Sequence, residues 1–130
     1  MSIFLYQLLF IALGGAFGAL SRFGLSQLVY QVMGRGYPWG TLTVNILGSF
    51  CIGFLYIFFE SRLQGAVALK QFLMVGFLGA LTTFSTFSLD SLLLIENGFL
   101  LKAVVNLISS VLLCLFAVWL GTVISRLFFN

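Results

Sequence analysis

The side chains most able to do chemistry gather between Gly76 and Ser88, in the segment GFLGALTTFSTFS. Phe84 and Phe87 are surrounded there by hydroxyl side chains, namely those of Thr82, Thr83, Ser85, Thr86 and Ser88. Hydroxyls are neutral hydrogen-bond donors, and the edges of phenylalanine rings carry partial positive charge. Because Phe84 and Phe87 are three residues apart, both rings can project from one helix face. This set of groups suits an anion better than a cation.

Two asparagines and a serine extend the set of neutral donors into other apolar segments. Asn45 lies about a turn inside an apolar run. Its amide either bonds across to a neighbouring helix or offers its N–H groups to a permeating ion. Asn106 and Ser110 are four residues apart and share a helix face, which forms either a polar lane or an internal hydrogen-bonded seam. The residues alone leave both pairs of alternatives open.

Ionisable and thiol side chains offer little further chemistry. The acidic residues Glu60, Asp90 and Glu96 fall at or toward the ends of apolar runs. A proton-coupled exporter needs a carboxylate within the membrane, so this placement disfavours such an exporter. Cys51 and Cys114 lie in apolar runs without a CxxC pattern or histidine neighbours. We therefore interpret both cysteines as small buried hydrophobic residues rather than as a disulfide or metal pair.

The composition indicates that the surrounding solvent is a lipid bilayer. Hydrophobic residues make up 62% of the chain and charged residues 7%, with a mean hydropathy of +1.20. An ordinary soluble domain has about 25% charged residues. The net charge of +3 comes from six scattered Lys and Arg residues, which excludes a surface that follows a nucleic-acid backbone. We expect a single transmembrane domain over residues 1–130, with no enzyme domain attached.

The apolar runs predict an all-α membrane protein with four spanning helices, at about residues 3–32, 40–60, 70–96 and 99–128. The segment GRGYP at 34–38 predicts a tight first loop, and the polar residues between Glu60 and Lys70 predict a hinge between two pairs of helices. The third helix is expected to be interrupted within Gly76 to Ser88. Irregular backbone and clustered hydroxyls are tolerated at membrane depth only where protein or a wet cavity surrounds them.

The first predicted helix carries two features with alternative roles. Gly14 and Gly18 form a GxxxG pair, which lets another helix approach closely, either within one subunit or between subunits. Arg22 follows, and a guanidinium near membrane depth must reach the headgroups or find carbonyl partners. We interpret Arg22 first as an interfacial anchor, with the attraction of anions as the alternative.

The basic residues near the helix ends show almost no preference for one side of the membrane. One side has three (Arg62, Lys70 and Arg126), and the other has two or three (Arg35, Lys102 and, if it reaches that side, Arg22). Such residues normally concentrate on the cytoplasmic side and set orientation. With so small a bias, we expect the chain to insert both ways and to pair as an antiparallel homodimer.

Three segments together resemble the Fluc (CrcB) family of bacterial fluoride channels. They are the glycine-rich first helix that ends at Arg22, GTLTVN at 40–45, and GFLGALTTFSTFS at 76–88. The resemblance covers the whole chain in length, number of helices and order of motifs. It implies a passive, fluoride-selective channel in the bacterial inner membrane that exports fluoride and relieves its toxicity. It also implies a dual-topology antiparallel homodimer with two pores.

The resemblance assigns roles to residues of the pore. Asn45 matches the pore asparagine of the family, and Phe84 and Phe87 match the paired rings whose edges contact fluoride. The hydroxyls of Ser85 and Thr86 belong to the same polar environment.

Further positions complete what the resemblance implies. Ser110 falls where the family has a pore hydroxyl, whereas Cys114 stands one turn on, where a second hydroxyl is expected. Backbone carbonyls of Gly79 and Thr82, from both subunits, would hold a structural sodium ion at the interruption of the third helix. A small proton-coupled multidrug exporter and a purely structural membrane subunit are the alternative functions.

Overall fold

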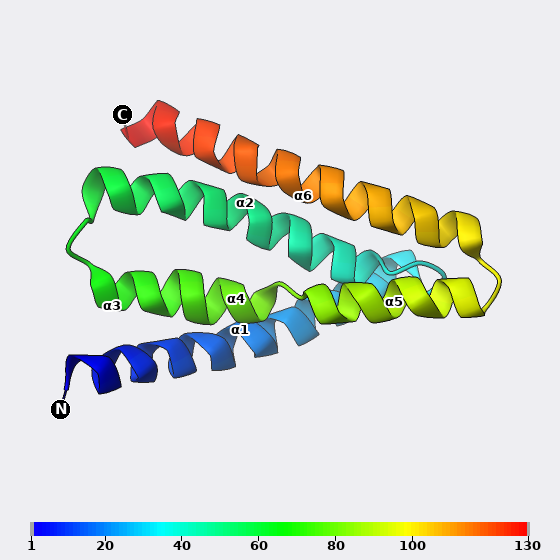
Figure 1. The fold of residues 1–130 in the computed structure, drawn as a ribbon, viewed down its shortest axis with the longest axis horizontal. Helices are drawn as coiled ribbons and strands as arrows, with labels where there is room; N and C mark the ends of the chain where they lie inside the picture. The colour runs from blue at the N-terminus through cyan, green and yellow to red at the C-terminus, as the bar shows by residue number, and fades with distance from the viewer. Residues whose placement is uncertain (1, 130) are drawn as a thin grey trace.

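The computed structural model describes residues 2–129, which form helices joined by short connections (Figure 1). The elements in chain order are α1 (Ile3–Met33), α2 (Trp39–Arg62), α3 (Val67–Lys70), the π-helix η1 (Gln71–Leu78), α4 (Gly79–Leu81), α5 (Phe84–Glu96) and α6 (Leu100–Phe129). Four stretches are long and apolar enough to cross a membrane: Ile3–Met33, Trp39–Arg62, Val67–Glu96 and Leu100–Phe129. The predicted all-α class with four such helices is confirmed, and the protein is a multi-pass membrane protein.

Turn residues fix the ends of the helices as their chemistry requires. Gly34 follows α1 with φ of 78°, a conformation that glycine adopts without strain, and its N–H donates to the Tyr30 carbonyl. Pro38 precedes α2, where its missing N–H costs no helical hydrogen bond. Gly98 has φ of 82° between α5 and α6. These turns make the two outer connections short.

The helices pack in two groups through close backbone contacts. α2 lies mainly against α6, and α1 lies mainly against η1 and α4. A Cβ atom built on Gly14 or Gly18 would overlap backbone atoms of η1, and one on Gly121 would overlap the backbone of α2. Glycine allows such approach where van der Waals packing drives association in lipid. The structure thus gives the Gly14–Gly18 pair its packing role within the subunit.

The third apolar stretch contains backbone that differs from an ordinary α-helix. Gln71–Leu78 has π-helical hydrogen bonding, a short form that is uncommon and often lies near functional sites. α4 ends at Leu81, and α5 begins at Phe84. Between them, Thr82 (φ −82°, ψ 154°) and Thr83 (φ −152°, ψ 116°) have extended backbone. We call these two residues the Thr82–Thr83 linker.

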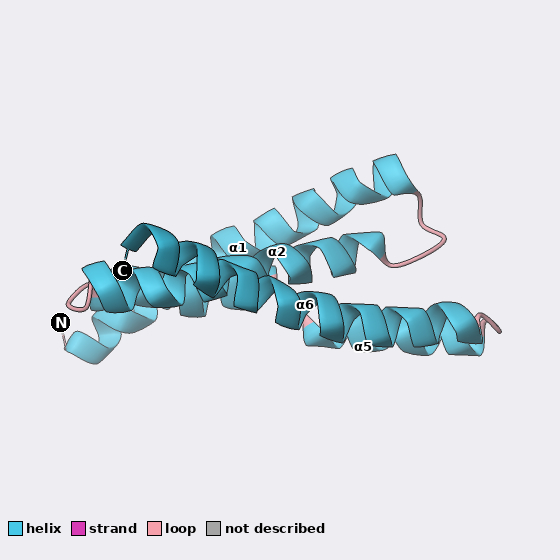
Figure 2. Cartoon of the chain, turned by 90° about the horizontal axis from the view of Figure 1, so that it is seen from above, coloured by secondary structure: helices cyan, strands magenta, loops and turns pink. Residues whose placement is uncertain are grey.

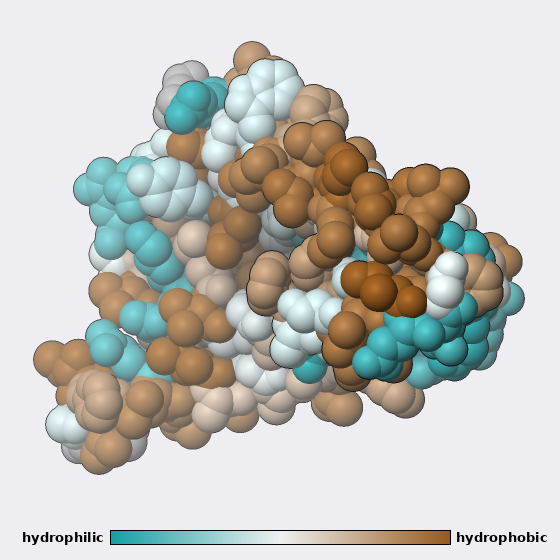
Figure 3. Space-filling view, turned by 45° about the vertical axis from the view of Figure 1, so that its right-hand side comes forward, coloured by the Kyte–Doolittle hydropathy of each residue, from teal (hydrophilic) through white to brown (hydrophobic). Residues whose placement is uncertain are grey.

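Most of the surface is apolar, and its polar side chains gather in patches. In Figure 3 brown, hydrophobic side chains cover much of the face, and teal side chains gather at its upper left and lower right. At one end of the molecule Lys102 reaches the Gly36 carbonyl, and elsewhere Lys70 pairs with Glu60 at 3.2 Å. Seen from above, the end formed by α1 and α2 separates from the end formed by α5 and α6 (Figure 2).

Candidate functional site

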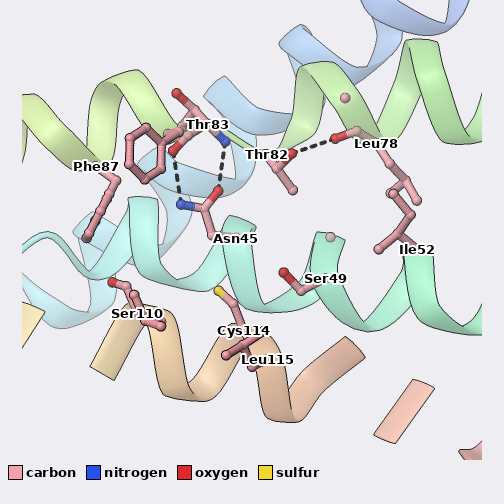
Figure 4. Close-up of a pocket in the computed structure, with 14 residues that line it drawn as sticks. Asn45, Ser49, Ile52, Leu78, Thr82, Thr83, Phe87, Ser110, Cys114 and Leu115 are labelled. Carbon is pink, nitrogen blue, oxygen red and sulfur yellow. Dashed lines mark hydrogen bonds between the residues drawn. The ribbon is translucent and has the colours of Figure 1, made fainter. Parts of the chain in front are cut away.

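A cavity of about 490 Å³ lies between α2, the Thr82–Thr83 linker, α5 and α6 (Figure 4). Its wall brings together most of the site residues predicted from the sequence: Asn45, Gly79, Thr82, Phe84, Phe87 and Ser110. Cys114, one turn beyond Ser110, also lines it. Ser85 and Thr86 are not among its lining residues. The cavity therefore gathers neutral donors and aromatic rings from three helices.

The amide of Asn45 is held by the linker through two hydrogen bonds, which Figure 4 shows as dashed lines. Its Oδ1 accepts from the backbone N–H of Thr83 at 2.7 Å, and its Nδ2 donates to the Thr83 carbonyl at 3.1 Å. Of the two alternatives from the sequence, the contact across to a neighbouring segment is thus present. The second N–H of the amide has no hydrogen-bond partner among residues 2–129, so one donor of Asn45 stays available at the cavity wall.

The two phenylalanine rings lie together but differ in exposure. Their centroids are 5.4 Å apart and their planes meet at 53°. Phe87 is 7% exposed, whereas Phe84 is 78% exposed. One ring therefore packs inside the subunit, and the other projects from its surface beside the cavity.

Most hydroxyls of the segment are engaged with nearby backbone. Thr82 Oγ1 and Ser88 Oγ each donate to the carbonyl four residues earlier, both at 2.9 Å. Thr83 Oγ1 accepts from the Thr86 N–H at 3.1 Å and so caps the start of α5. Ser85 Oγ and Thr86 Oγ1 lie 3.2 and 3.1 Å from Thr83 Oγ1. Fewer hydroxyls are free for a ligand than their number in the sequence indicates.

A buried hydrogen-bonded seam joins α5 to α6. Asn106 is 1% exposed, and its Nδ2 donates to Ser91 Oγ at 3.0 Å. Ser110 Oγ donates to the Asn106 Oδ1 at 3.4 Å, and Ser91 Oγ donates to the Phe87 carbonyl at 2.8 Å. The structure thus selects the internal seam over a separate polar lane. Sequence reasoning missed Ser91, although its place four residues after Phe87 was a usable signal.

Arg22 reaches the linker rather than standing apart from it. Its Nη1 lies 3.5 Å from the Thr82 carbonyl oxygen, and its side chain is half-buried. A guanidinium at such a position finds a carbonyl partner, which is one of the two solutions open to it in a membrane. The positive charge of α1 therefore faces the oxygen at the end of α4.

A second cavity, of about 570 Å³, lies between the first loop and the α5–α6 end, where the helices separate in Figure 2. Thr86 lines it, together with the charged residues Arg35, Asp90 and Lys102. Asp90 Oδ2 accepts from the hydroxyl of Thr41 at 2.6 Å. The wall of this cavity therefore includes charged groups, and its carboxylate already holds a hydrogen bond.

Both cysteines are free thiols with intermediate exposure. Within residues 2–129, no three His, Cys, Asp or Glu side chains come together as metal ligands do.

Comparison with known proteins agrees with the resemblance read from the sequence. The family described as CrcB-like protein, Camphor Resistance (CrcB), matches residues 9–122. A protein of Magnetococcus marinus named fluoride-specific ion channel FluC is 53% identical over 121 residues, covering 93% of this chain and 98% of that protein. A protein of the same name from Vibrio vulnificus is 52% identical over 112 residues, covering 86% and 89%. Another, from Methylococcus capsulatus, is 53% identical over 116 residues, which are 89% of this chain but 51% of that longer protein. The chain therefore belongs to the CrcB family.

Proposed function

We propose that the protein is a fluoride-selective channel of the bacterial inner membrane, through which fluoride leaves the cell down its electrochemical gradient. Such efflux relieves fluoride toxicity. The observation that carries the proposal is the cavity whose largely apolar wall includes the neutral polar side chains of Asn45 and Ser110 and two phenylalanine rings, in a chain about half identical to proteins named fluoride-specific ion channels. Fluoride holds its water tightly, so a pore must replace that shell by several weak sites that bind and release the ion.

The positions of the side chains support the pore residues in this proposal. Asn45, Phe87 and Ser110 line the cavity with an amide, an aromatic ring and a hydroxyl, and Phe84 adds a second, exposed ring. Thr86 lines the second cavity and would extend the pore toward that end of the molecule. Ser85, whose hydroxyl lies beside that of Thr83, belongs to the same stretch.

The working unit in this proposal is an antiparallel homodimer with two pores. The balance of basic residues between the two sides supports insertion in both orientations. The exposed ring of Phe84 supports a partner surface, because a second subunit would cover it and complete the wall of the pore. Each pore would then draw residues from both subunits.

A structural sodium ion between the subunits belongs to the same proposal, held by the carbonyls of Gly79 and Thr82. Among residues 2–129 no hydrogen bond reaches the Gly79 carbonyl, and the Thr82 carbonyl meets only the guanidinium of Arg22. Carbonyls without a helical partner, at the ends of half-helices, are ligands that sodium takes in membrane proteins. The oxygen atoms present therefore fit a hard monovalent cation. Bound there, it would offset the carbonyl dipoles and hold the subunits together.

Ion release from liposomes tests the channel. Purified protein is reconstituted into vesicles loaded with potassium fluoride or potassium chloride, and release is started with a potassium ionophore and followed with the matching electrode. We expect rapid release of fluoride and none of chloride above that of empty vesicles. No release of fluoride, or equal release of both ions, would overturn the assignment.

Labelling of one loop from each side of the membrane tests the antiparallel arrangement. Gly36 lies in the first loop, where an added side chain meets no atom within 4 Å, so Gly36→Cys is compatible with the fold. In a background with both native cysteines replaced, we expect an impermeant thiol reagent to label about half of the copies from either side. Labelling from one side alone would contradict dual topology.

A further inference from the structure

The linker leaves two particular carbonyls without their helical partners. In a continuous α-helix each carbonyl accepts from the N–H four residues later. The Gly79 carbonyl would then accept from Thr83, and the Thr82 carbonyl from Thr86. Neither bond forms: the Thr83 N–H donates to Asn45 Oδ1 at 2.7 Å, and the Thr86 N–H donates to Thr83 Oγ1 at 3.1 Å. The side chains of Asn45 and Thr83 thus accept the two N–H groups that a continuous helix would have used.

The side chain that accepts from the Thr83 N–H comes from another helix. Asn45 belongs to α2, and its amide satisfies both backbone groups of Thr83, the N–H at 2.7 Å and the carbonyl at 3.1 Å. Thr83 is buried, and unpaired backbone groups at such a site are costly. The amide therefore stabilises the extended conformation of Thr83, which in turn prevents α4 from continuing into α5.

The two carbonyls released in this way are those assigned above to sodium. We propose that Asn45 and Thr83 are positioning residues for the cation site: by diverting two N–H groups, they leave the carbonyls of Gly79 and Thr82 without helical partners, so that both can bind a cation. This inference rests on the proposed sodium site and adds its cause. Asn45 then has two roles. Its amide holds the linker through two hydrogen bonds, and its second N–H stays available at the cavity wall. The pore and the cation site thus share one side chain.

Sodium-dependent stabilisation of the purified protein provides the test. A ligand that binds only the folded protein raises its melting temperature as concentration increases, and the dependence yields an apparent affinity. Sodium chloride replaces N-methylglucamine chloride at constant ionic strength, and unfolding is followed in detergent. For Asn45→Leu, which keeps the branched outline of the side chain but removes the amide, we expect the apparent sodium affinity to fall at least tenfold.

A second buried asparagine provides the matched control. Asn106 lies in the seam between α5 and α6, and among residues 2–129 its hydrogen bonds go to Ser91 and Ser110 rather than to the linker. Asn106→Leu should lower the melting temperature and leave the sodium affinity within about twofold of wild type. A general loss of packing would lower the sodium affinity of both variants, whereas loss of the two hydrogen bonds between Asn45 and Thr83 lowers it only in Asn45→Leu.

Substitutions at Thr83 test the hydrogen bond from the Thr86 N–H to the Thr83 hydroxyl. They remain informative if Asn45→Leu does not fold. Thr83→Ser retains the hydroxyl that accepts from Thr86, so sodium affinity should be preserved. Thr83→Val has nearly the same shape but no acceptor, and its affinity should fall about as far as that of Asn45→Leu.

The outcomes separate this inference from the channel itself. If Asn45→Leu and Thr83→Val both bind sodium as tightly as wild type, the positioning role is overturned. If Asn45→Leu does not fold, wild-type affinity in Thr83→Val alone overturns it. In either case fluoride release by the wild-type protein would still support the channel. No fluoride release from wild type, with the expected pattern of sodium affinities, would overturn the channel and leave the positioning role in place. Absence of any sodium effect on wild type would overturn both the cation site and this inference.

Discussion

The contact between α1 and η1 allows a quantitative prediction for Gly18→Ala. A Cβ atom on Gly18 would overlap the carbonyl oxygen of Phe77 and lie 2.9 Å from its carbonyl carbon and 3.0 Å from its Cα. Carbon atoms pack best at about 3.5–4.0 Å and the carbonyl oxygen lies closer still, so the two helices must move apart by at least roughly 0.5–1 Å. The opposing atoms are backbone, and no change of rotamer relieves the overlap.

Two effects of opposite sign set the size of the change. Alanine is favoured over glycine inside a helix by about 0.5–1 kcal/mol. Overpacking costs about 1–3 kcal/mol, and backbone that cannot move aside places this site toward the upper part of that range. We therefore expect Gly18→Ala to lower the free energy of unfolding by about 1–2 kcal/mol, the overpacking cost less the helix gain.

Gly24 on the same helix provides the control, because a Cβ atom there meets nothing within 4 Å. Gly24→Ala should raise the free energy of unfolding by about 0.5–1 kcal/mol, since only the helix preference changes. Both variants are compared with wild type by reversible unfolding in mixed detergent micelles. Equal shifts of the same sign would refute the reasoning, because they would mean that the close backbone contact has no energetic effect.

Three further predictions concern the pore, the first loop and the exporter alternative. Phe84→Ile and Phe87→Ile should lower fluoride release from liposomes without changing the oligomeric state on gel filtration; wild-type release in both would remove the rings from the mechanism. Gly34→Ala should lower the free energy of unfolding, measured by thermal unfolding, by about 1 kcal/mol, because φ at this position is 78°. Gly36→Ala, where φ is not positive, should change this free energy little. Asp90→Asn should still release fluoride without a pH gradient, whereas an exporter that used this carboxylate would lose proton-driven exchange.

The sequence predicted the helices and the outer turns well because these depend on local composition. Apolar runs of membrane length became the four long helical stretches, and Gly34, in the predicted GRGYP loop, took a positive φ value that ends a helix. The π-helix at Gln71–Leu78 was not predicted. After Gln71 its sequence has no polar side chain, and the residues of α1 that it packs against are distant in the chain. No local periodicity distinguishes such a turn from an α-helix.

The candidate site was predictable as a set of residues but not as a set of bonds. Composition indicated neutral donors, and the cavity contains them. Their partners depend on tertiary contact: Asn45 bonds to Thr83, 38 residues away, and Asn106 bonds to Ser91. The hydroxyl of Thr82 instead bonds to backbone of its own turn, so counting hydroxyls overstated the donors free for an ion.

Arg22 leads to a last prediction, because it shares an oxygen with the proposed cation site. Its Nη1 lies 3.5 Å from the Thr82 carbonyl, which has two lone pairs and can face a guanidinium and a second cation together. Two positive charges at about 4 Å repel by about 4 kcal/mol at an effective dielectric constant of 20, so a charge beside the site opposes a second cation. Arg22→Gln keeps a donor for the carbonyl and removes the charge. The same sodium titration should therefore show affinity at least several-fold tighter than wild type, and equal or weaker affinity would mean that Arg22 and the cation do not share this carbonyl.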